Sequence, residues 1–256
     1  MVILALVLLA LHETATPLDA AAPWQVAPSS EGCIAQRTFK GEEAIQIGFE
    51  ETIHSRSPYL LVRAPNMMLP SGIGQINVSL DNAQPISIHY GAFATQDAGY
   101  RLLKLFPDKA ALASLHTATI IRLDGRMPPL RVTAMGAVLQ KLDECMSGKL
   151  ADWGVSPSLY FEDKLTKISK QFLLAFDDKH YPEEARKAGI SGRVILLLKT
   201  DPTGTITNCT AVESSDERLN AGSCAIAEEA RLIPPEDNSG HPIASYAFLP
   251  IRWNRP

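Results

Sequence analysis

The side chains of this sequence that could carry chemistry are its four cysteines and six histidines. The cysteines are Cys33, Cys145, Cys209 and Cys224. The histidines are His12, His54, His89, His116, His180 and His241. The cysteines lack the short C-x-x-C spacing of a zinc site, and the histidines form no H-x-x-x-H pair or Cys/His cluster. The expected chemistry is therefore disulfide formation, and we expect no metal and no cofactor.

Three further motifs fall short of an active site. Ser71 follows Pro70, so it lacks the G-x-S-x-G setting of a hydrolase nucleophile. Gly72-Ile73-Gly74 lacks the third glycine of a dinucleotide-binding loop, and Asp177-Asp178 is typical of a solvated pair at a helix end. The sequence predicts a protein that is not an enzyme. The alternative is an unrecognised hydrolase that uses His89 or His116.

The N-terminus predicts export. Met1 to Leu11 is an unbroken apolar run, and the small-residue cluster Ala20-Ala21-Ala22 follows it. This pattern is typical of a secretory signal peptide, although no Lys or Arg precedes the run. The run is shorter than the roughly 20 apolar residues of a membrane-spanning helix. We expect a signal peptide over residues 1–22. The alternatives are a buried helix and a retained anchor, which would be the chain's only membrane attachment.

Length and charge limit the remaining classes. The chain has 256 residues, enough for one large domain or two modest ones. Its 24 basic and 28 acidic residues give a net charge of −4, with no long run of either sign. We therefore expect no nucleic-acid partner.

The first half of the chain has the pattern of a β-rich domain. Short runs rich in β-branched and aromatic residues predict strands, and two stretches predict helices, Lys109–Leu115 and Met135–Leu150. The predicted strands are Cys33–Phe39, Ala44–Phe49, Tyr59–Arg63, Ile73–Leu80, Ile86–Tyr90 and Thr119–Leu123.

A break at Trp153 to Pro157 divides the chain. We place a β-rich domain of unknown function at 24–150, a linker at 151–163 and a second domain at 164–256, which starts with a helix over Lys164–Phe176. Four cysteines allow three pairings, and this division favours Cys33–Cys145 and Cys209–Cys224. Four reduced thiols are the alternative.

The second domain has the order helix, strand, strand, helix, strand. Pro182 suits the first turn of a helix, and Arg193–Thr200 and Ile206–Glu213 flank the turn Asp201 to Gly204. A helix over Leu219–Ala230 and a last strand over Ala244–Arg252 follow. This order predicts an α+β layer of a three-stranded antiparallel sheet with helices on one face.

The sequence of this segment resembles the TonB C-terminal domain family over about residues 181–253. The matching positions are Tyr181, Pro182, Gly189, Gly192, Gly204, Ser214, Ser215, Leu219 and Pro234. Asp216, Asn220 and Leu232 depart from the family pattern and are expected to affect turn and core detail. The fold expected for the whole chain is therefore α+β, a β-rich domain followed by a small TonB-like domain.

The resemblance implies a periplasmic protein-binding module. In the family, a peptide from an outer-membrane receptor adds to the last strand of the sheet. The edge residues here would be Ser245, Tyr246, Ala247, Phe248, Leu249, Pro250, Ile251 and Arg252. Another envelope protein or a second copy of the chain are alternative partners, and an envelope scaffold without a transport role is the alternative function. The chain lacks the Pro-rich spacer of energy-transducing members, which puts coupling to an inner-membrane proton motor in doubt.

Overall fold

The computed structural model describes residues 15–41, 43–55, 57–124 and 127–254. The chain forms two compact units. Unit 1 consists of residues 1–25, 35–49 and 59–139, and unit 2 of residues 26–34, 50–58 and 140–256. Most of the expected signal peptide, including His12, lies outside the described residues. None of the described helices is long and apolar enough to span a bilayer.

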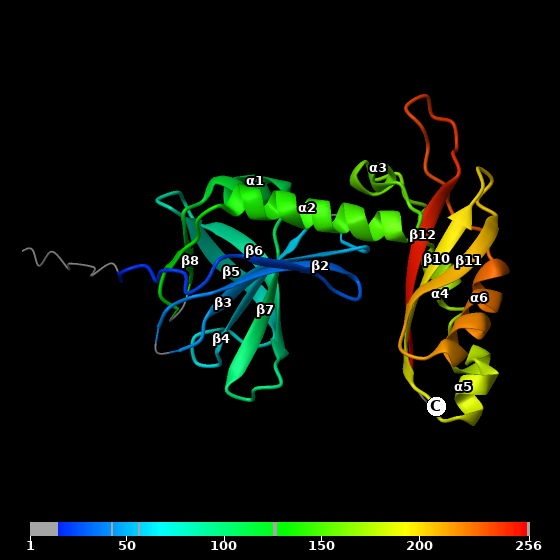
Figure 1. Ribbon diagram of the computed structural model, residues 1–256, viewed down its shortest axis with the longest axis horizontal. Coiled ribbons are helices and arrows are strands. Elements are labelled where there is room, and N and C mark those ends of the chain that lie inside the picture. Colours follow the sequence, from blue (N-terminus) through cyan, green and yellow to red (C-terminus); the bar gives the residue numbers. More distant parts are fainter. Residues whose placement is uncertain (1–14, 42, 56, 125–126, 255–256) are drawn as a thin grey trace, which may run out of the picture. The chain divides into compact units, whose positions relative to one another are not determined.

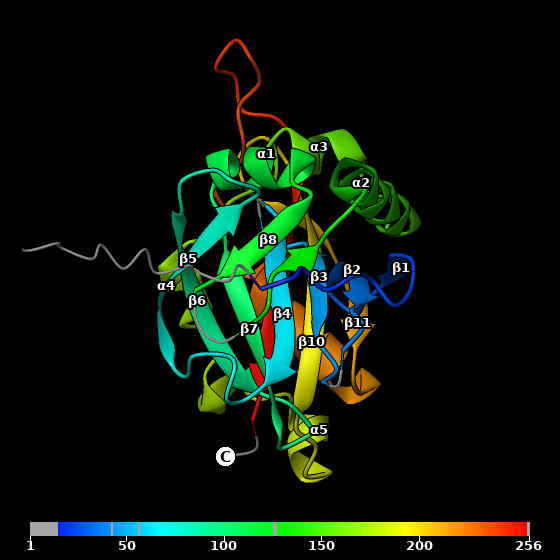
Figure 2. The ribbon, with the colours of Figure 1, turned by 90° about the vertical axis from the view of Figure 1, so that its left-hand side faces the viewer.

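A curled antiparallel sheet of nine strands dominates the first half of the chain (Figure 2). Its strand order is β1-β2-β3-β4-β7-β6-β5-β8-β9. The strands are β1 (Gln25–Pro28), β2 (Gly32–Thr38), β3 (Gln46–Thr52), β4 (Tyr59–Pro65), β5 (Ile73–Leu80), β6 (Ile86–Ala94), β7 (Tyr100–Phe106), β8 (Ile120–Leu123) and β9 (Leu130–Arg131). The expected β-rich character is confirmed.

Strand β7 was not among the predicted strands, yet it lies in the middle of this sheet. Leu103 and Leu105 are fully buried, and Leu105 pairs with Leu60 of β4. Lys104, between them, is only partly buried and places its ammonium 3.9 Å from the centre of the Tyr59 ring. This alternation is that of a strand with one face in the core.

Two helices accompany the sheet, as the sequence predicts. Helix α1 (Lys109–Thr117) is capped by Asp108, whose carboxylate accepts a bond from the amide of Ala111 at 2.8 Å. Helix α2 (Met135–Asp152) buries an apolar stripe along its length. The stripe consists of Met135, Val138, Leu139, Leu142, Met146 and Leu150.

Part of the expected signal peptide pairs with unit 1. The amide of Leu18 donates to the carbonyl of Pro129 at 2.8 Å, and Ala20 forms a bridge with Phe39. The carboxylate of Asp19 accepts a bond from Nε of Arg131 at 2.9 Å. Cleavage after Ala22 would remove these contacts, whereas cleavage before Leu18 would keep them.

The second sheet has three antiparallel strands in the order β11-β10-β12. The strands are β10 (Gly192–Thr200), β11 (Ile206–Ser214) and β12 (Ser245–Trp253). The turn between β10 and β11 needs Gly204, which has a φ of 80° and so close an approach to the carbonyl of Leu232 that a Cβ would clash. The predicted sheet is confirmed.

Helices cover one face of this sheet, which we call the helical face (Figure 1). They are α4 (Lys170–Leu173), η1 (Asp178–His180), α5 (Glu183–Lys187), η2 (Glu217–Leu219) and α6 (Asn220–Glu228). Buried side chains of the strands and helices form one cluster there, which includes Leu196, Leu198, Leu249, Leu219 and Ala227. The expected arrangement of helices on one face of a three-stranded sheet is therefore present.

The helix predicted over Lys164–Phe176 is wrong for most of its length, because only α4 is helical. Residues 164–167 are not helical, and Lys167 exchanges two backbone hydrogen bonds with Ile233 at 2.9 and 3.1 Å. Leu165 packs on one face of the sheet, whereas Ile168 and Phe172 pack on the other. The apolar side chains whose spacing suggested a single helical stripe therefore pack on two different faces of the sheet.

The other face of the sheet, which we call the second face, is covered by segments remote in sequence. Ile195, Leu197 and Phe248 of the sheet contribute to a buried cluster here. The covering side chains are Ile53, Met146, Leu150 and Val155, with Trp153 and Tyr160 partly buried beside them. Helix α3 (Pro157–Phe161), which supplies Tyr160, lies within the predicted linker. All of these residues belong to unit 2.

Both disulfides have the favoured pairing. Cys33 is joined to Cys145 across 112 residues, and Cys209 of β11 is joined to Cys224 of α6 across 15 residues. No described cysteine is free. The first bond ties β2 to α2 within unit 2, and the second holds α6 under an outer strand of the sheet.

We expect each disulfide to stabilise the fold by constraining the unfolded chain. Replacing Cys209 and Cys224 together by serine should lower the free energy of unfolding by about 3 kcal/mol, and replacing Cys33 and Cys145 by about 4–5 kcal/mol. Denaturant unfolding of the two double variants beside the wild type measures both values. A double variant as stable as the wild type would contradict the prediction for that disulfide.

Candidate functional site

Strand β12 is an outer strand of its sheet, which is the property that strand addition requires. It pairs with β10 from Gly192 opposite Trp253 to Thr200 opposite Ser245. No other strand of the described chain pairs with it. One side of its backbone is therefore open to a partner over part of its length.

The open stretch of this edge is short. The carbonyl of Tyr246 accepts a bond from the amide of Thr166 at 2.8 Å, so the backbone groups of Tyr246 point away from β10 and its carbonyl is already used. Because backbone groups alternate along a strand, those of Phe248, Pro250 and Arg252 point away from β10 as well. Pro250 has no N–H, so the open edge offers two donors and three acceptors.

The side chains along β12 contribute to this edge unequally. Phe248 is 6% exposed and packs against Trp153 with ring centroids 5.5 Å apart. Leu249 and Ile251 are buried on the helical face. Only Pro250 and Arg252 have exposed side chains among the residues of β12. A partner at this edge would meet main chain and these two residues rather than an apolar stripe.

The residues of the family motif build the domain rather than the open edge of β12. The ring of Tyr181 packs against Trp253 at 5.1 Å, and its hydroxyl donates to the carbonyl of Ile190. Pro182 packs against Gly222 of α6, where a Cβ would lie 2.8 Å from its ring. Gly189 has a φ of 67° and ends α5.

The remaining motif residues lie where the sheet meets the helices. The hydroxyl of Ser215 accepts a bond from the amide of Arg193 at 2.7 Å, and a Cβ at Gly192 would collide with it. The hydroxyl of Ser214 donates to the carbonyl of Asp216 at 2.8 Å. Leu219 is fully buried. Pro234, also in the motif, lies beside Gly204.

A buried carboxyl group beneath the second face was not predicted from the sequence. Glu51 is only 4% exposed, and its Oε2 has no hydrogen-bond partner among the described residues. Burial, followed by the nearby charge of Asp143, raises the pKa of Glu51 to about 7. The hydroxyl of Tyr160 lies 2.8 Å from the carbonyls of both Thr52 and Ser55, and burial raises the pKa of that hydroxyl. Nothing in the local sequence distinguishes Glu51 from its neighbour Glu50.

His54 lies in the same segment of unit 2 and is affected in the opposite direction. Its Nε2 lies 3.9 Å from a carboxylate oxygen of Glu31, which also pairs with Arg193. Burial, followed by the charge of Arg193, lowers the pKa of His54 to about 4. We therefore expect His54 to be neutral at pH 7.

The histidines that a hydrolase would need are in separate places. Nε2 of His89 lies 3.0 Å from the amide nitrogen of Gln75, an exposed cross-strand pair. The ring of His116 lies against Gly136 of α2, where a Cβ would clash with it. Among the described residues, no group of three His, Cys, Asp or Glu side chains is arranged to hold a metal.

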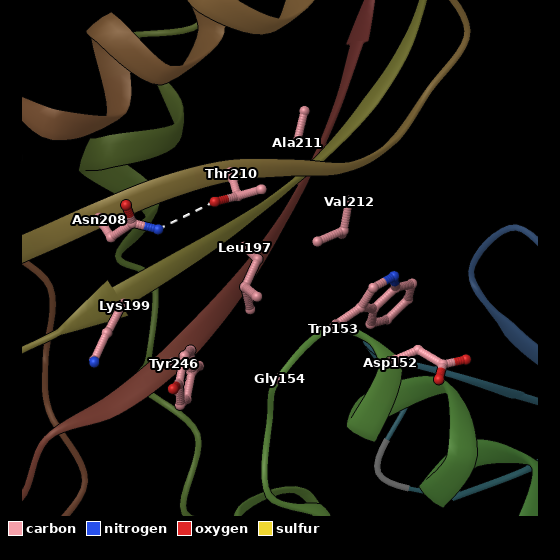
Figure 3. Close-up of a pocket in the computed structure, with 10 residues that line it drawn as sticks. All are labelled: Asp152, Trp153, Gly154, Leu197, Lys199, Asn208, Thr210, Ala211, Val212 and Tyr246. Carbon is pink, nitrogen blue, oxygen red and sulfur yellow. Dashed lines mark hydrogen bonds between the residues drawn. The ribbon is translucent and has the colours of Figure 1, made fainter.

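A cavity of about 440 Å³ opens on the second face of the small sheet (Figure 3). Leu197 lies at its centre, with Trp153 on one side and Tyr246 on the other. The remaining lining residues are Asp152, Gly154, Lys199, Asn208, Thr210, Ala211 and Val212. All ten residues belong to unit 2.

Comparison with known proteins identifies the C-terminal segment. Residues 177–254 match the family described as Gram-negative bacterial TonB protein C-terminal. The segment predicted from Tyr181 to Trp253 is thus a TonB C-terminal domain. The match supports a TonB-like role in general.

Two further comparisons add little. The chain matches no curated protein. Among solved structures, it matches the crystal structure of invasion associated protein B from Bartonella henselae. That match has 16% identity and a TM-score of 0.35, and covers 46% of this chain and 89% of that chain.

The pKa shifts of Glu51 and His54 predict that the stability of the fold depends on pH. The folded protein raises the pKa of Glu51 from 4.5 to about 7, so this carboxyl contributes stability that is complete below pH 4.5 and is lost as the pH rises through 7. His54, whose pKa is lowered from 6.5 to about 4, contributes stability that is present above pH 6.5 and is lost as the pH falls through 4. The two contributions oppose each other in the wild type.

The variant Glu51→Gln isolates the first contribution. We expect its free energy of unfolding, relative to the wild type, to rise between pH 4.5 and 7 by at most about 3 kcal/mol. Denaturant unfolding at a series of pH values measures the difference, with Glu228→Gln on the exposed surface of α6 as the control. A difference that does not change with pH would show that the environment of Glu51 does not favour its protonated form.

Proposed function

We propose that this protein is a periplasmic TonB-like binding module that engages an outer-membrane receptor by strand addition at β12. The observation that carries the proposal is the open edge at Phe248, Pro250 and Arg252, within a segment that matches the TonB C-terminal family. Main-chain hydrogen bonds to this edge would supply affinity, and the covered start of β12 would set where the peptide begins.

Export to the periplasm is part of this proposal. The apolar N-terminal run, the small-residue cluster and the two disulfides support it, since disulfides form in oxidising compartments. Retention of the N-terminal segment as an inner-membrane anchor is the alternative to its removal. We assign no separate activity to the β-rich region at 24–150.

The position of Arg252 allows the main-chain interaction to be tested apart from the side chain. Its N–H points away from β10, so Arg252→Pro removes a donor from the open edge and keeps the pairing with β10. Arg252→Ala removes the same side chain and keeps the donor. We expect Arg252→Pro to weaken binding of a receptor's N-terminal peptide about tenfold or more, and Arg252→Ala to weaken it little.

Calorimetric titration of a synthetic peptide covering that N-terminal segment measures both variants. Equal loss in the two variants would indicate recognition of the side chain rather than strand addition. A photo-crosslinking residue at position 252, with position 187 on exposed α5 as the control, identifies the partner in cells. Capture of only a second copy of the chain or of cell-wall-bound proteins would favour the envelope scaffold over the transport role.

A further inference from the structure

The cavity on the second face has an apolar floor between two aromatic rings. Leu197 is 6% exposed, and Val212 is half-buried beside it. Trp153 and Tyr246 are also half-buried and lie on either side of Leu197 (Figure 3). The indole of Trp153 is held by the ring of Phe248 and by the ammonium of Lys149, 4.8 Å from its centre. These surfaces can pack against a ligand with a rigid apolar ring.

The polar groups around the cavity include donor-only groups, the indole N–H of Trp153 and the ammonium of Lys199, and groups that both donate and accept, the hydroxyls of Tyr246 and Thr210 and the amide of Asn208. Asn208 already donates to the Thr210 hydroxyl at 3.1 Å (Figure 3). Asp152 is the one carboxylate in the lining. In the part of the chain that the structure describes, Lys199 and Asp152 have no ion-pair partner, and the Tyr246 hydroxyl and the Trp153 indole have no acceptor. The donors of Trp153, Tyr246 and Lys199 can be satisfied by a ligand that offers carbonyl acceptors.

The backbone of β10 beneath the cavity has no free groups to offer. Leu197 pairs with Thr210 of β11 on one side and with Phe248 of β12 on the other. Lys199 likewise pairs with Asn208 and Tyr246. A peptide over these residues cannot bind as an added strand, because the hydrogen bonds of β10 are already made. Recognition has to come from the side chains.

We propose that this cavity binds a proline-rich segment of another protein in the polyproline II conformation. Such a segment has no internal hydrogen bonds, so its carbonyls remain free to accept. Its prolines have no N–H to leave unpaired. Their rings pack between aromatic side chains, and the rigid conformation limits the entropy lost on binding. The site is distinct from the β12 edge, which binds through main chain.

Other ligand classes fit the lining less well. A purely apolar molecule would leave the donors of Trp153 and Tyr246 without acceptors on losing water. A strongly anionic ligand would meet Asp152 as well as Lys199.

The direct test uses acetyl-decaproline-amide as the probe and an acetylated (Gly-Ser)5-amide of the same length as its control. Titration into the full-length protein is followed by the NMR shift of the Trp153 indole N–H. We expect decaproline to bind with a Kd below about 1 mM and the Gly-Ser peptide to bind at least tenfold more weakly. Equal binding of the two peptides, or no binding of decaproline, would overturn the proposal.

Substitutions locate the binding to the cavity. We expect Tyr246→Phe to weaken decaproline binding about threefold to tenfold, since it removes a hydroxyl donor. We expect a similar factor for Asn208→Ala, which removes the N–H that Asn208 has left after its bond to Thr210. Asn238→Ala, on an exposed loop outside the cavity, is the matched control and should bind as the wild type does. Thermal unfolding of each variant establishes that the fold is kept.

The outcomes also separate this proposal from strand addition. Arg252→Pro should leave decaproline binding unchanged, because Arg252 does not line the cavity. Unchanged decaproline binding in both Asn208→Ala and Tyr246→Phe would place the peptide elsewhere and overturn the proposal. Binding of a neutral sugar such as cellotetraose, lost in the same two variants, with no binding of decaproline, would likewise overturn it.

Discussion

The burial of strand β10 on both of its faces is the constraint on which unit 2 depends. Five successive aliphatic side chains of this strand, Val194 to Leu198, are at most 6% exposed. A strand that is apolar on both sides is stable only when both faces of its sheet are covered. The helices α5 and α6 cover one face within the TonB C-terminal segment itself. The other face has to be covered by residues outside residues 177–254, and these are supplied by α2, α3 and the segment around Ile53.

Covering the second face brings polar groups under the sheet along with apolar ones. Glu51 enters with Ile53, and its burial raises its pKa to about 7. Lys149 spans from the carbonyl of Ser29 to the carboxylate of Glu213, 3.0 Å away. The cover does not reach the Lys199 end of the sheet, where Trp153 and Tyr246 border a cavity instead. The packing that stabilises β10 thus also creates the features for which the local sequence gives no sign.

The predictable part of the fold was the part specified by local chemistry. Three features act over only a few residues, so the sequence predicts them directly. They are the turn from Asp201 to Gly204, the aliphatic run of β10 and the proline at the start of α5. Strand β7 was missed, although its alternating leucines carried the signal, and the helix over Lys164–Phe176 was wrong because its apolar residues serve two faces. The burial of Glu51 depends on Tyr160, over 100 residues away, which no local pattern can show.

The open edge of β12 and the cavity over β10 differ in what they can recognise. On β12, Pro250 removes one donor and Thr166 covers Tyr246, which limits indiscriminate pairing with other strands. A partner there has to align its backbone with Phe248 and Arg252, while side-chain identity matters less. Over β10 the reverse holds, because its backbone is fully paired and only side chains remain. Tyr246 contributes its carbonyl to the closed part of the edge and its ring to the cavity wall. One sheet can therefore present a main-chain site and a side-chain site without competition for the same hydrogen-bonding groups.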